Sequence, residues 1–431
     1  MKKFEEVNNL KFSYISKQDE NLSPILELYR GKVYSNILKN FISSCTEKLN
    51  SHIFSQKKSY PRTITNLLSS WFFTLYVDYD FKNDPFFPDN YNNTESLEET
   101  LFDFCKYDSN LINYKVKINN IINDLKTSYK ESIKNLSEYK NSDKYLSLIN
   151  DYQVEKEEKI QIRNGDELIF YKFTIKIPFK FKDKRQENII NNILLPKSIY
   201  IKLKNQYNGP EDKLDIYLWC IIYRYQLLGS NNNQLGVLPN ILNKMKNDFG
   251  LEFECFASAI NSTFTNYCSI YYDLEKFFGS KGNFFDLNPI NGTYSFNPPY
   301  QKNVMEKGIN KLIQLLEKST LINEKLTFII TIPIWDKIGK KIMKFSYPEK
   351  RRTPDIEYNE FNIINDVFKS KFFKAKLMVP KDKFTYIDHN FQLLKNVTIQ
   401  HTYILVLSND NIDFQKKLNE YKFEVEVNIT V

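Results

Sequence analysis

Hydrophobic side chains in the first part of the chain follow the spacing of amphipathic helices. They recur every three or four positions, which gathers them on one face of a helix. This pattern covers residues 23–41, 63–77 and 111–137. Pro85, Pro88 and the polar residues 89–93 interrupt it and predict a surface loop between helices.

A β-hairpin is predicted after these helices, near residues 160–177. Apolar side chains at 160–163 and 167–177 flank Asn164-Gly165. An Asn-Gly pair readily adopts the positive φ angles of a tight turn between antiparallel strands. Basic residues follow at 180–185, where they form either an exposed basic rim or an ordinary solvated loop.

Short apolar strands alternate with helices from about residue 196 onward. Helices are predicted at residues 214–228, 239–249 and 303–317. Strands are predicted at residues 252–257, 267–272, 282–287, 293–296, 326–333, 374–379 and 402–408. This alternation predicts an α/β fold with a largely parallel sheet. We therefore expect a mainly helical domain with the hairpin over residues 1–190 and an α/β domain over residues 191–431.

Composition and charge restrict the class of protein. Hydrophobic residues make up 42% and charged residues 26% of the 431 positions, which excludes a wholly disordered chain. The net charge of +8 permits a polyanionic partner without requiring one. Five cysteines form no Cys-x-x-Cys pair and three histidines are scattered, so neither a disulfide framework nor a metal site is predicted. No apolar stretch is long enough to cross a membrane, and the N-terminus has no signal-peptide core, so we expect an intracellular protein.

The most informative motif is Asn297-Pro298-Pro299-Tyr300, which follows a predicted strand and precedes a predicted helix. Two successive prolines fix φ and make the turn rigid, so the Asn297 side chain and the Pro298 carbonyl point in fixed directions. These two oxygens suit the exocyclic amine of adenine, which is a weak nucleophile because its lone pair is delocalised into the ring. Accepting hydrogen bonds from both amine protons favours a more tetrahedral nitrogen, while Tyr300 stacks on the base. Taken alone, the motif is more often a turn that merely ends a strand, but its position after a strand of an α/β sheet favours a functional role.

An ordered series of further matches accompanies this motif over roughly residues 195–412. The matching positions are Arg224 to Gln226, Leu238-Pro239, Phe253 to Ser258, Asn261, Tyr267 to Ser269, Phe278 to Ser280, Asn297 to Pro299, Phe328-Ile329, Ile332-Pro333, Trp335, Leu377 to Pro380, Leu405, Leu407, Asn409 and Asp410. On these residues the chain resembles the cap-specific adenosine N6-methyltransferase family of the phosphorylated-CTD-interacting-factor type. The series is more specific than any one of its motifs.

The resemblance implies a Rossmann-like methyltransferase domain that uses S-adenosylmethionine. Its catalytic residues would be Asn297, Pro298, Pro299 and Tyr300. The donor would be held by Glu254, Cys255, Phe256, Ala257 and Ser258 after the first strand, and by Asn261, Asp273, Asp286, Arg224 and Gln226. Ligands of open α/β sheets bind at the carboxyl ends of strands, which suits this loop and the Asn297 turn. Without the resemblance, Asp273 is equally an exposed loop residue.

The chain also departs from the family pattern. Tyr300 replaces the phenylalanine of the family motif, and the paired tryptophans of an N-terminal WW domain are absent. We therefore expect no WW domain and do not carry binding of the polymerase tail over from the family. Basic segments at residues 57–62 and 340–352 either hold RNA phosphates or form ordinary solvated surface.

The expected activity is methyl transfer from S-adenosylmethionine to N6 of (2′-O-methyl)adenosine next to the 7-methylguanosine cap of mRNA. The expected partner is capped mRNA that begins with adenosine, bound in part by the helical domain. Two alternatives remain open from the residues: an adenine N6-methyltransferase acting on DNA or internal RNA, and a catalytically inactive RNA-binding scaffold. The location is expected to be nuclear for a cellular protein and cytoplasmic for a viral one.

Overall fold

The computed structural model describes eleven segments of the chain. They are residues 22–49, 60–77, 84–105, 111–150, 152–163, 166–176, 193–229, 234–334, 363–389, 395–397 and 401–421. These residues fall into two compact units, which are described separately. The helical unit contains described residues of Asn8–Asn233 together with Asp273–Phe277, and the sheet unit contains those of Gln234–Tyr272 and Phe278–Val431. The boundary thus follows residue 233 instead of residue 190.

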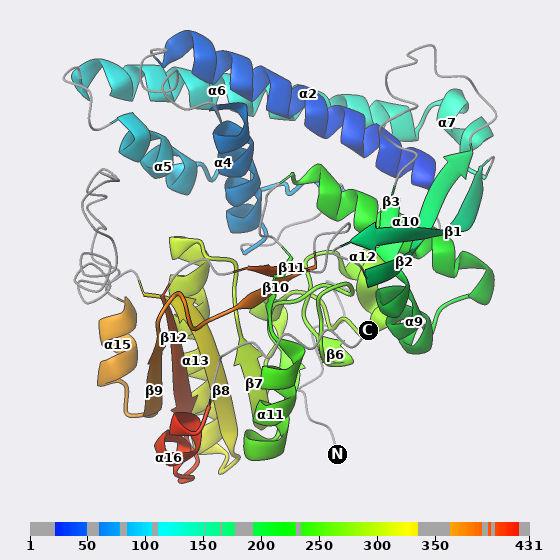
Figure 1. Ribbon diagram of the computed structural model, residues 1–431. Coiled ribbons are helices and arrows are strands. Elements are labelled where there is room, and N and C mark those ends of the chain that lie inside the picture. Colours follow the sequence, from blue (N-terminus) through cyan, green and yellow to red (C-terminus); the bar gives the residue numbers. More distant parts are fainter. Residues whose placement is uncertain are drawn as a thin grey trace. The chain divides into compact units, whose positions relative to one another are not determined.

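Helices make up the first part of the helical unit, as predicted (Figure 1). They are α2 (Pro24–Lys48), α4 (Tyr60–Leu75), α5 (Glu95–Cys105), α6 (Leu111–Lys140) and α7 (Asp143–Leu148). Ser23 starts α2 by accepting a hydrogen bond from the amide of Ile25, and Pro24 at the first helical position needs no partner for a missing N–H. The long helices α2 and α6 run side by side in Figure 1. The buried rings of Phe72 and Trp71 in α4 contact Tyr34 of α2 and Tyr129 of α6, with centroids 5.3 and 5.9 Å apart.

The predicted surface loop after α4 is confirmed for residues 89–93, which are half-buried or exposed, and wrong for residues 85–88, which are buried. Residues 84–88 are buried, and two tyrosine hydroxyls hold the loop by its carbonyl groups. Tyr76 Oη donates to the carbonyl of Phe86 at 2.9 Å, and Tyr129 Oη donates to that of Pro88 at 2.8 Å. Two phenylalanines next to the prolines give this loop enough apolar surface to join the core.

The predicted hairpin is confirmed. Strand β1 (Gln153–Arg163) pairs antiparallel with β2 (Asp166–Lys176), and the turn at residues 164–165 lies outside the described residues. Strand β3 (Ile193–Pro196) pairs with β2, and three helical segments follow. These are α9 (Lys197–Gln206), the 3-10 helix η2 (Glu211–Lys213) and α10 (Leu214–Leu227).

The sheet unit is built on a six-stranded sheet with the order β6-β5-β7-β8-β12-β9. Its strands are β5 (Leu251–Glu254), β6 (Asn266–Tyr267), β7 (Gly292–Phe296), β8 (Leu326–Pro333), β9 (Phe373–Val379) and β12 (Thr402–Ser408). Among them β12 runs antiparallel to its neighbours β8 and β9, and the pairings from β6 to β8 are parallel. Beyond β6, Ser280 forms a parallel bridge with Tyr267, and the Ser269 and Ser280 hydroxyls lie 2.7 Å apart. This is a Rossmann-like methyltransferase sheet.

Helices cover both faces of this sheet. On one face α11 (Pro239–Phe249) and α16 (Phe414–Asn419) bury apolar side chains against it. On the other face α13 (Lys302–Leu321) and α15 (Ile363–Lys369) do the same. Because both faces are buried, the central strands are almost continuously apolar, as residues 326–333 are.

A second, three-stranded sheet completes this unit. Its order is β11-β10-β4, and all its pairings are antiparallel. The strands are β4 (Leu235–Val237), β10 (Tyr386–Asp388) and β11 (Lys395–Val397). Tyr386 of β10 is buried in the same cluster as α11 and α16.

Two strand predictions need correction. The strand expected at residues 267–272 ends at Tyr267, and α12 (Tyr272–Glu275) and the 3-10 helix η3 (Lys276–Phe278) follow. The strand expected at residues 282–287 is instead the 3-10 helix η4 (Phe284–Asp286). Asn283 starts this turn, because its side chain accepts a hydrogen bond from the amide of Phe285. In the described part of the chain, no helix is long and apolar enough to cross a membrane.

Candidate active site

The Asn297 motif occupies the turn between β7 and α13, as the sequence predicts. Strand β7 ends at Phe296, and α13 begins at Lys302. The amide of Gln301 donates to the carbonyl of Pro299 at 2.7 Å, which closes the turn. Pro298 is buried and Asn297 is half-buried, so the asparagine side chain lies at the surface of a rigid support.

The sheet register brings this turn to the same edge as the loop after β5. Glu254 at the end of β5 pairs with Ser295 of β7, two residues before Asn297. Antiparallel β12 starts where β8 ends, and Thr402 pairs there with Pro333. Loops at the carboxyl ends of parallel strands form the ligand sites of open α/β sheets.

Three hydroxyl groups extend from the sheet to the Asn297 side chain. Tyr300 Oη donates to Asn297 Oδ1 at 3.2 Å and lies 2.6 Å from Tyr386 Oη. Tyr386 Oη lies 3.1 Å from Thr402 Oγ1. Burial raises the pKa of Tyr300 well above its ordinary value, and it raises the pKa of Tyr386 to about 12. Both phenols are therefore protonated at neutral pH.

The loop after β5 is closed by its own polar side chains. Glu254 Oε1 accepts hydrogen bonds from the amides of Thr263 at 2.6 Å and Phe264 at 2.9 Å. The amide of Ser258 donates to Asn261 Oδ1 at 2.6 Å, and its hydroxyl donates to Gln234 Oε1 at the same distance. These side chains hold the shape of the loop.

The residues at the start of this loop, Cys255 to Ala257, differ in their exposure to solvent. Cys255 is fully buried, and burial raises the pKa of its thiol well above the ordinary value. Phe256 and Ala257 are half-buried, and the Phe256 ring packs against Phe285 with centroids 5.9 Å apart. The loop thus presents aromatic surface and backbone at the sheet edge.

Asp286 ends the 3-10 helix η4 and lies close to Lys311 of α13. Lys311 Nζ donates to the carbonyl of Phe285 at 2.7 Å. Burial lowers the pKa of Lys311 to about 8, and the negative charge of Asp286 opposes that shift. A lysine with this pKa carries its charge in only part of the population near pH 8.

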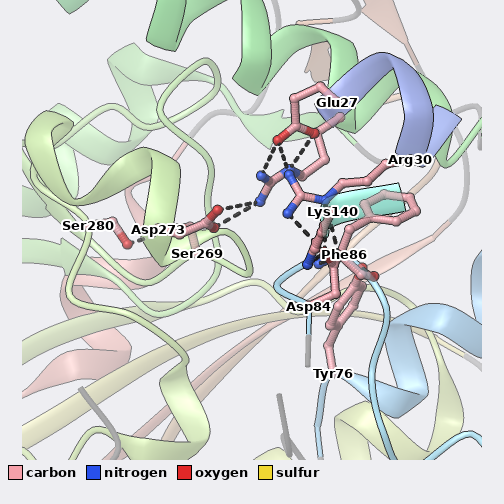
Figure 2. Close-up of polar contacts among 10 residues, drawn as sticks. Glu27, Arg30, Tyr76, Asp84, Phe86, Lys140, Ser269, Asp273 and Ser280 are labelled. Carbon is pink, nitrogen blue, oxygen red and sulfur yellow. Dashed lines mark hydrogen bonds and ion pairs between the residues drawn. The ribbon is translucent and has the colours of Figure 1, made fainter. Parts of the chain in front are cut away.

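Arg224 and Asp273 lie in a buried ion network of the helical unit (Figure 2). Arg224 is fully buried in α10; its Nη1 donates to both Asp273 carboxylate oxygens, at 2.8 and 2.9 Å, and its Nε donates to Glu27 Oε2 at 3.1 Å. Burial raises the pKa of Asp273, although the charge of Arg224 opposes that change. Gln226 is exposed on the same helix.

The network continues through residues that the sequence analysis did not identify. Glu27 also pairs with Arg30, whose guanidinium donates to both oxygens of Asp84. Lys140 Nζ lies 2.6 Å from Asp84 Oδ2. Burial alone would raise the pKa of Asp84, but the charges of Arg30 and Lys140 hold it well below the ordinary value. The only sequence signal was a Glu and an Arg three positions apart on the otherwise apolar face of α2.

Comparison with known proteins begins with a family model. Residues 197–365 match the family described as the phosphorylated CTD interacting factor 1 WW domain. The match includes α10, the β5 loop and the Asn297 turn. This part of the chain is similar to that family. The resemblance to the phosphorylated-CTD-interacting-factor family is thereby confirmed.

Two curated relatives of the family match a shorter stretch. The proteins of Mus musculus and Homo sapiens named mRNA (2'-O-methyladenosine-N(6)-)-methyltransferase are each 36% identical to this chain over 124 residues. That stretch is 27% of this chain and 17% of each relative, so the chain matches only a small part of their length. Both names describe a methyltransferase, which needs a methyl donor.

The expectation that the chain lacks a WW domain is wrong, because the description of the matching phosphorylated-CTD-interacting-factor family names that domain. The expectation rested on missing tryptophan pairs near the N-terminus. The match lies instead in residues 197–365, where Trp219 is buried in α10. The basic segments at 57–62, 180–185 and 340–352 fall almost wholly outside the residues whose side chains the structure describes.

Proposed function

We propose that this protein is an mRNA cap-adjacent adenosine N6-methyltransferase of the phosphorylated-CTD-interacting-factor family. The observation that carries the proposal is the Asn297 turn at the carboxyl edge of a methyltransferase sheet, within the family match. The substrate would be capped mRNA that begins with (2′-O-methyl)adenosine, as the names of the two relatives suggest.

Asn297, Pro298, Pro299 and Tyr300 would act on the adenine amine. Asn297 Oδ1 and the Pro298 carbonyl would accept hydrogen bonds from its two N–H groups, which makes the nitrogen lone pair more available. The half-buried Tyr300 ring would stack on the base and hold it in place. Asn297 and Pro298 would thus orient the amine, and the Tyr300 ring would orient the adenine base.

S-adenosylmethionine would supply an electrophilic methyl group when bound. The residues at the sheet edge fit it: Phe256 and Phe285 offer aromatic surface, and the adjacent Asp286 carboxylate offers an acceptor for an adenine amine. The loop after β5 would bind the donor in two ways. Its shape would be held by the side chains of Glu254, Ser258 and Asn261, and direct contacts would come from the backbone of Cys255 and Ala257. Asp273 with Arg224, and Gln226, remain proposed donor-binding residues of the helical unit.

The remaining proposals concern partners and place. The helical part would be an accessory domain that binds RNA and the cap. Because the family description names a phosphorylated CTD, a pull-down with phosphorylated CTD peptides would test binding of the polymerase tail. An enzyme acting on mRNA caps would work in the nucleus of a cell, or in the cytoplasm for a virus that replicates there.

The deciding experiment measures transfer of a labelled methyl group from S-adenosylmethionine to short RNAs. The RNAs begin with cap-A, cap-G or uncapped A, and Asn297→Ala is the variant. We expect transfer to cap-A RNA alone and a loss of about 100-fold or more in the variant, as is typical when a group that stabilises the transition state is removed.

Other outcomes contradict specific parts of the proposal. Equal rates on capped and uncapped RNA would exclude cap specificity. A methyl mark found away from the 5′ end, or only on DNA, would identify a different adenine methyltransferase. Failure of S-adenosylmethionine and its demethylated product to raise the melting temperature, together with no transfer, would indicate an inactive scaffold.

A further inference from the structure

The side-chain amide of Asn297 has two orientations that differ by a half-turn. In one, Oδ1 faces the adenine amine and accepts a hydrogen bond from it. In the other, the NH₂ group faces the amine, and two hydrogen-bond donors repel each other. A partner that donates to the oxygen would favour the productive orientation. A hydroxyl can donate or accept, and the Tyr300 hydroxyl acts here as the donor, to Asn297 Oδ1 at 3.2 Å.

The direction of the remaining hydrogen bonds follows from proton counting. Each hydroxyl has one proton to donate. Since the Tyr300 hydroxyl donates its hydrogen bond to Asn297, its oxygen is left to accept one from Tyr386 Oη, 2.6 Å away. Tyr386 has then used its proton and accepts from Thr402 at 3.1 Å. The order of donation is therefore Thr402, Tyr386, Tyr300, Asn297.

The end of this series is anchored in rigid parts of the sheet unit. Thr402 is fully buried at the start of β12 and pairs with Pro333 and Val379. Tyr386 is 1% exposed in β10, and its ring meets that of Tyr300 edge to face at a centroid distance of 6.3 Å. The position of the Tyr300 hydroxyl is thus set by two separate strands.

We propose that the Tyr300 hydroxyl, held by Tyr386, is a positioning group that keeps Asn297 Oδ1 turned toward the adenine amine. This inference rests on the proposed function for its catalytic consequence. It assigns a use to the one atom by which Tyr300 differs from phenylalanine at the same place. The aromatic ring would retain its separate task of stacking.

The test compares Tyr300→Phe, Tyr386→Phe and the double variant with the wild type on cap-A RNA. One lost hydrogen bond predicts a kcat about three- to tenfold lower for Tyr300→Phe, with KM for RNA unchanged because the stacking ring remains. Tyr386→Phe should lower kcat less. The double variant should have a kcat no lower than that of Tyr300→Phe alone, because both changes interrupt the same series of hydrogen bonds.

Tyr294→Phe is the matched control. Tyr294 lies buried in β7, and its hydroxyl donates to the carbonyl of Asn291 at 3.0 Å, away from the turn. We expect its kcat to stay within twofold of wild type. A Tyr300→Phe enzyme with wild-type kcat, or with a change in KM alone, would overturn the inference.

A second measurement needs no activity and separates this inference from the proposed function. Urea midpoints are measured without ligand for Asn297→Ala, Tyr300→Phe and their double variant. A bond between the two side chains predicts a shift in the double variant smaller than the sum of the single shifts. Additive shifts would refute the bond, and a wild-type protein that methylates no RNA would refute the proposed function alone.

Discussion

Arg224 and Asp273 form a close ion pair, with Arg224 Nη1 2.8 and 2.9 Å from the two carboxylate oxygens. On its other side Arg224 donates to Glu27, so one buried guanidinium bridges two acids from different segments. Burying such charges is costly unless each has a partner. Removing the arginine would leave both acids without this partner inside the protein, so it should strongly lower the stability of the fold.

Arg224→Met should destabilise the protein by about 3–5 kcal/mol, because Glu27 and Asp273 lose a shared partner inside the protein. Urea unfolding at pH 7 measures this change. The exposed neighbour Gln226→Ala is the control and should change stability by less than about 0.5 kcal/mol. A loss below about 1 kcal/mol for Arg224→Met would show that the network does not support the helical unit.

Lys311 should make stability depend on pH in the alkaline range. Because burial lowers its pKa in the folded protein to about 8 from 10.5, the unfolded chain binds more protons between these values. The contribution of Lys311 to stability therefore rises from pH 8 to pH 10.5. The free energy of unfolding is measured for wild type and Lys311→Met across this range. The stability of wild type relative to the variant should increase as pH rises, because the variant lacks the titrating lysine. A constant difference would contradict the lowered pKa.

Gly308→Ala should disturb the packing beneath the Asn297 turn. A Cβ atom at Gly308 would lie 2.4 Å from Phe296 Cζ, and Phe296 immediately precedes Asn297. Overpacking of this kind costs about 1–3 kcal/mol. Thermal unfolding should show the loss, and Phe296→Leu in the same protein should restore part of it. Gln314→Ala on the exposed side of α13 is the control, and equal stability of the two alanine variants would exclude the clash.

Glu254→Ala should loosen the loop after β5. The substitution leaves the amides of Thr263 and Phe264 without their shared acceptor, at a cost of about 1–3 kcal/mol. Glu254→Gln retains an acceptor oxygen and should lose less. If the loop binds the methyl donor, the rise in melting temperature on adding S-adenosylmethionine should also be smaller for Glu254→Ala. Equal stability of both variants and wild type would show that Glu254 does not hold the loop.

Much of the architecture could be predicted from residue patterns. Helix α11 and strands β8 and β12 begin and end where the apolar pattern predicts. Long elements are predictable because their apolar pattern, periodic in α11 and continuous in the two buried strands, extends over several residues. The 3-10 helix at Phe284–Asp286 was missed because three residues are too few for a period, and a capping side chain at Asn283 decided the local geometry.

The sequence by itself determined the α/β class, the Asn297 turn between a strand and a helix, and the resemblance to the family. These depend on local order along the chain, where rigid prolines and periodic apolar residues act on their neighbours. Only the tertiary structure decided the partners of Tyr300 and Arg224. Tyr386 lies 86 positions from Tyr300, and Glu27 lies 197 from Arg224. Such pairings arise because burial forces each polar group to find a partner, and the fold of the whole chain determines which partner is near.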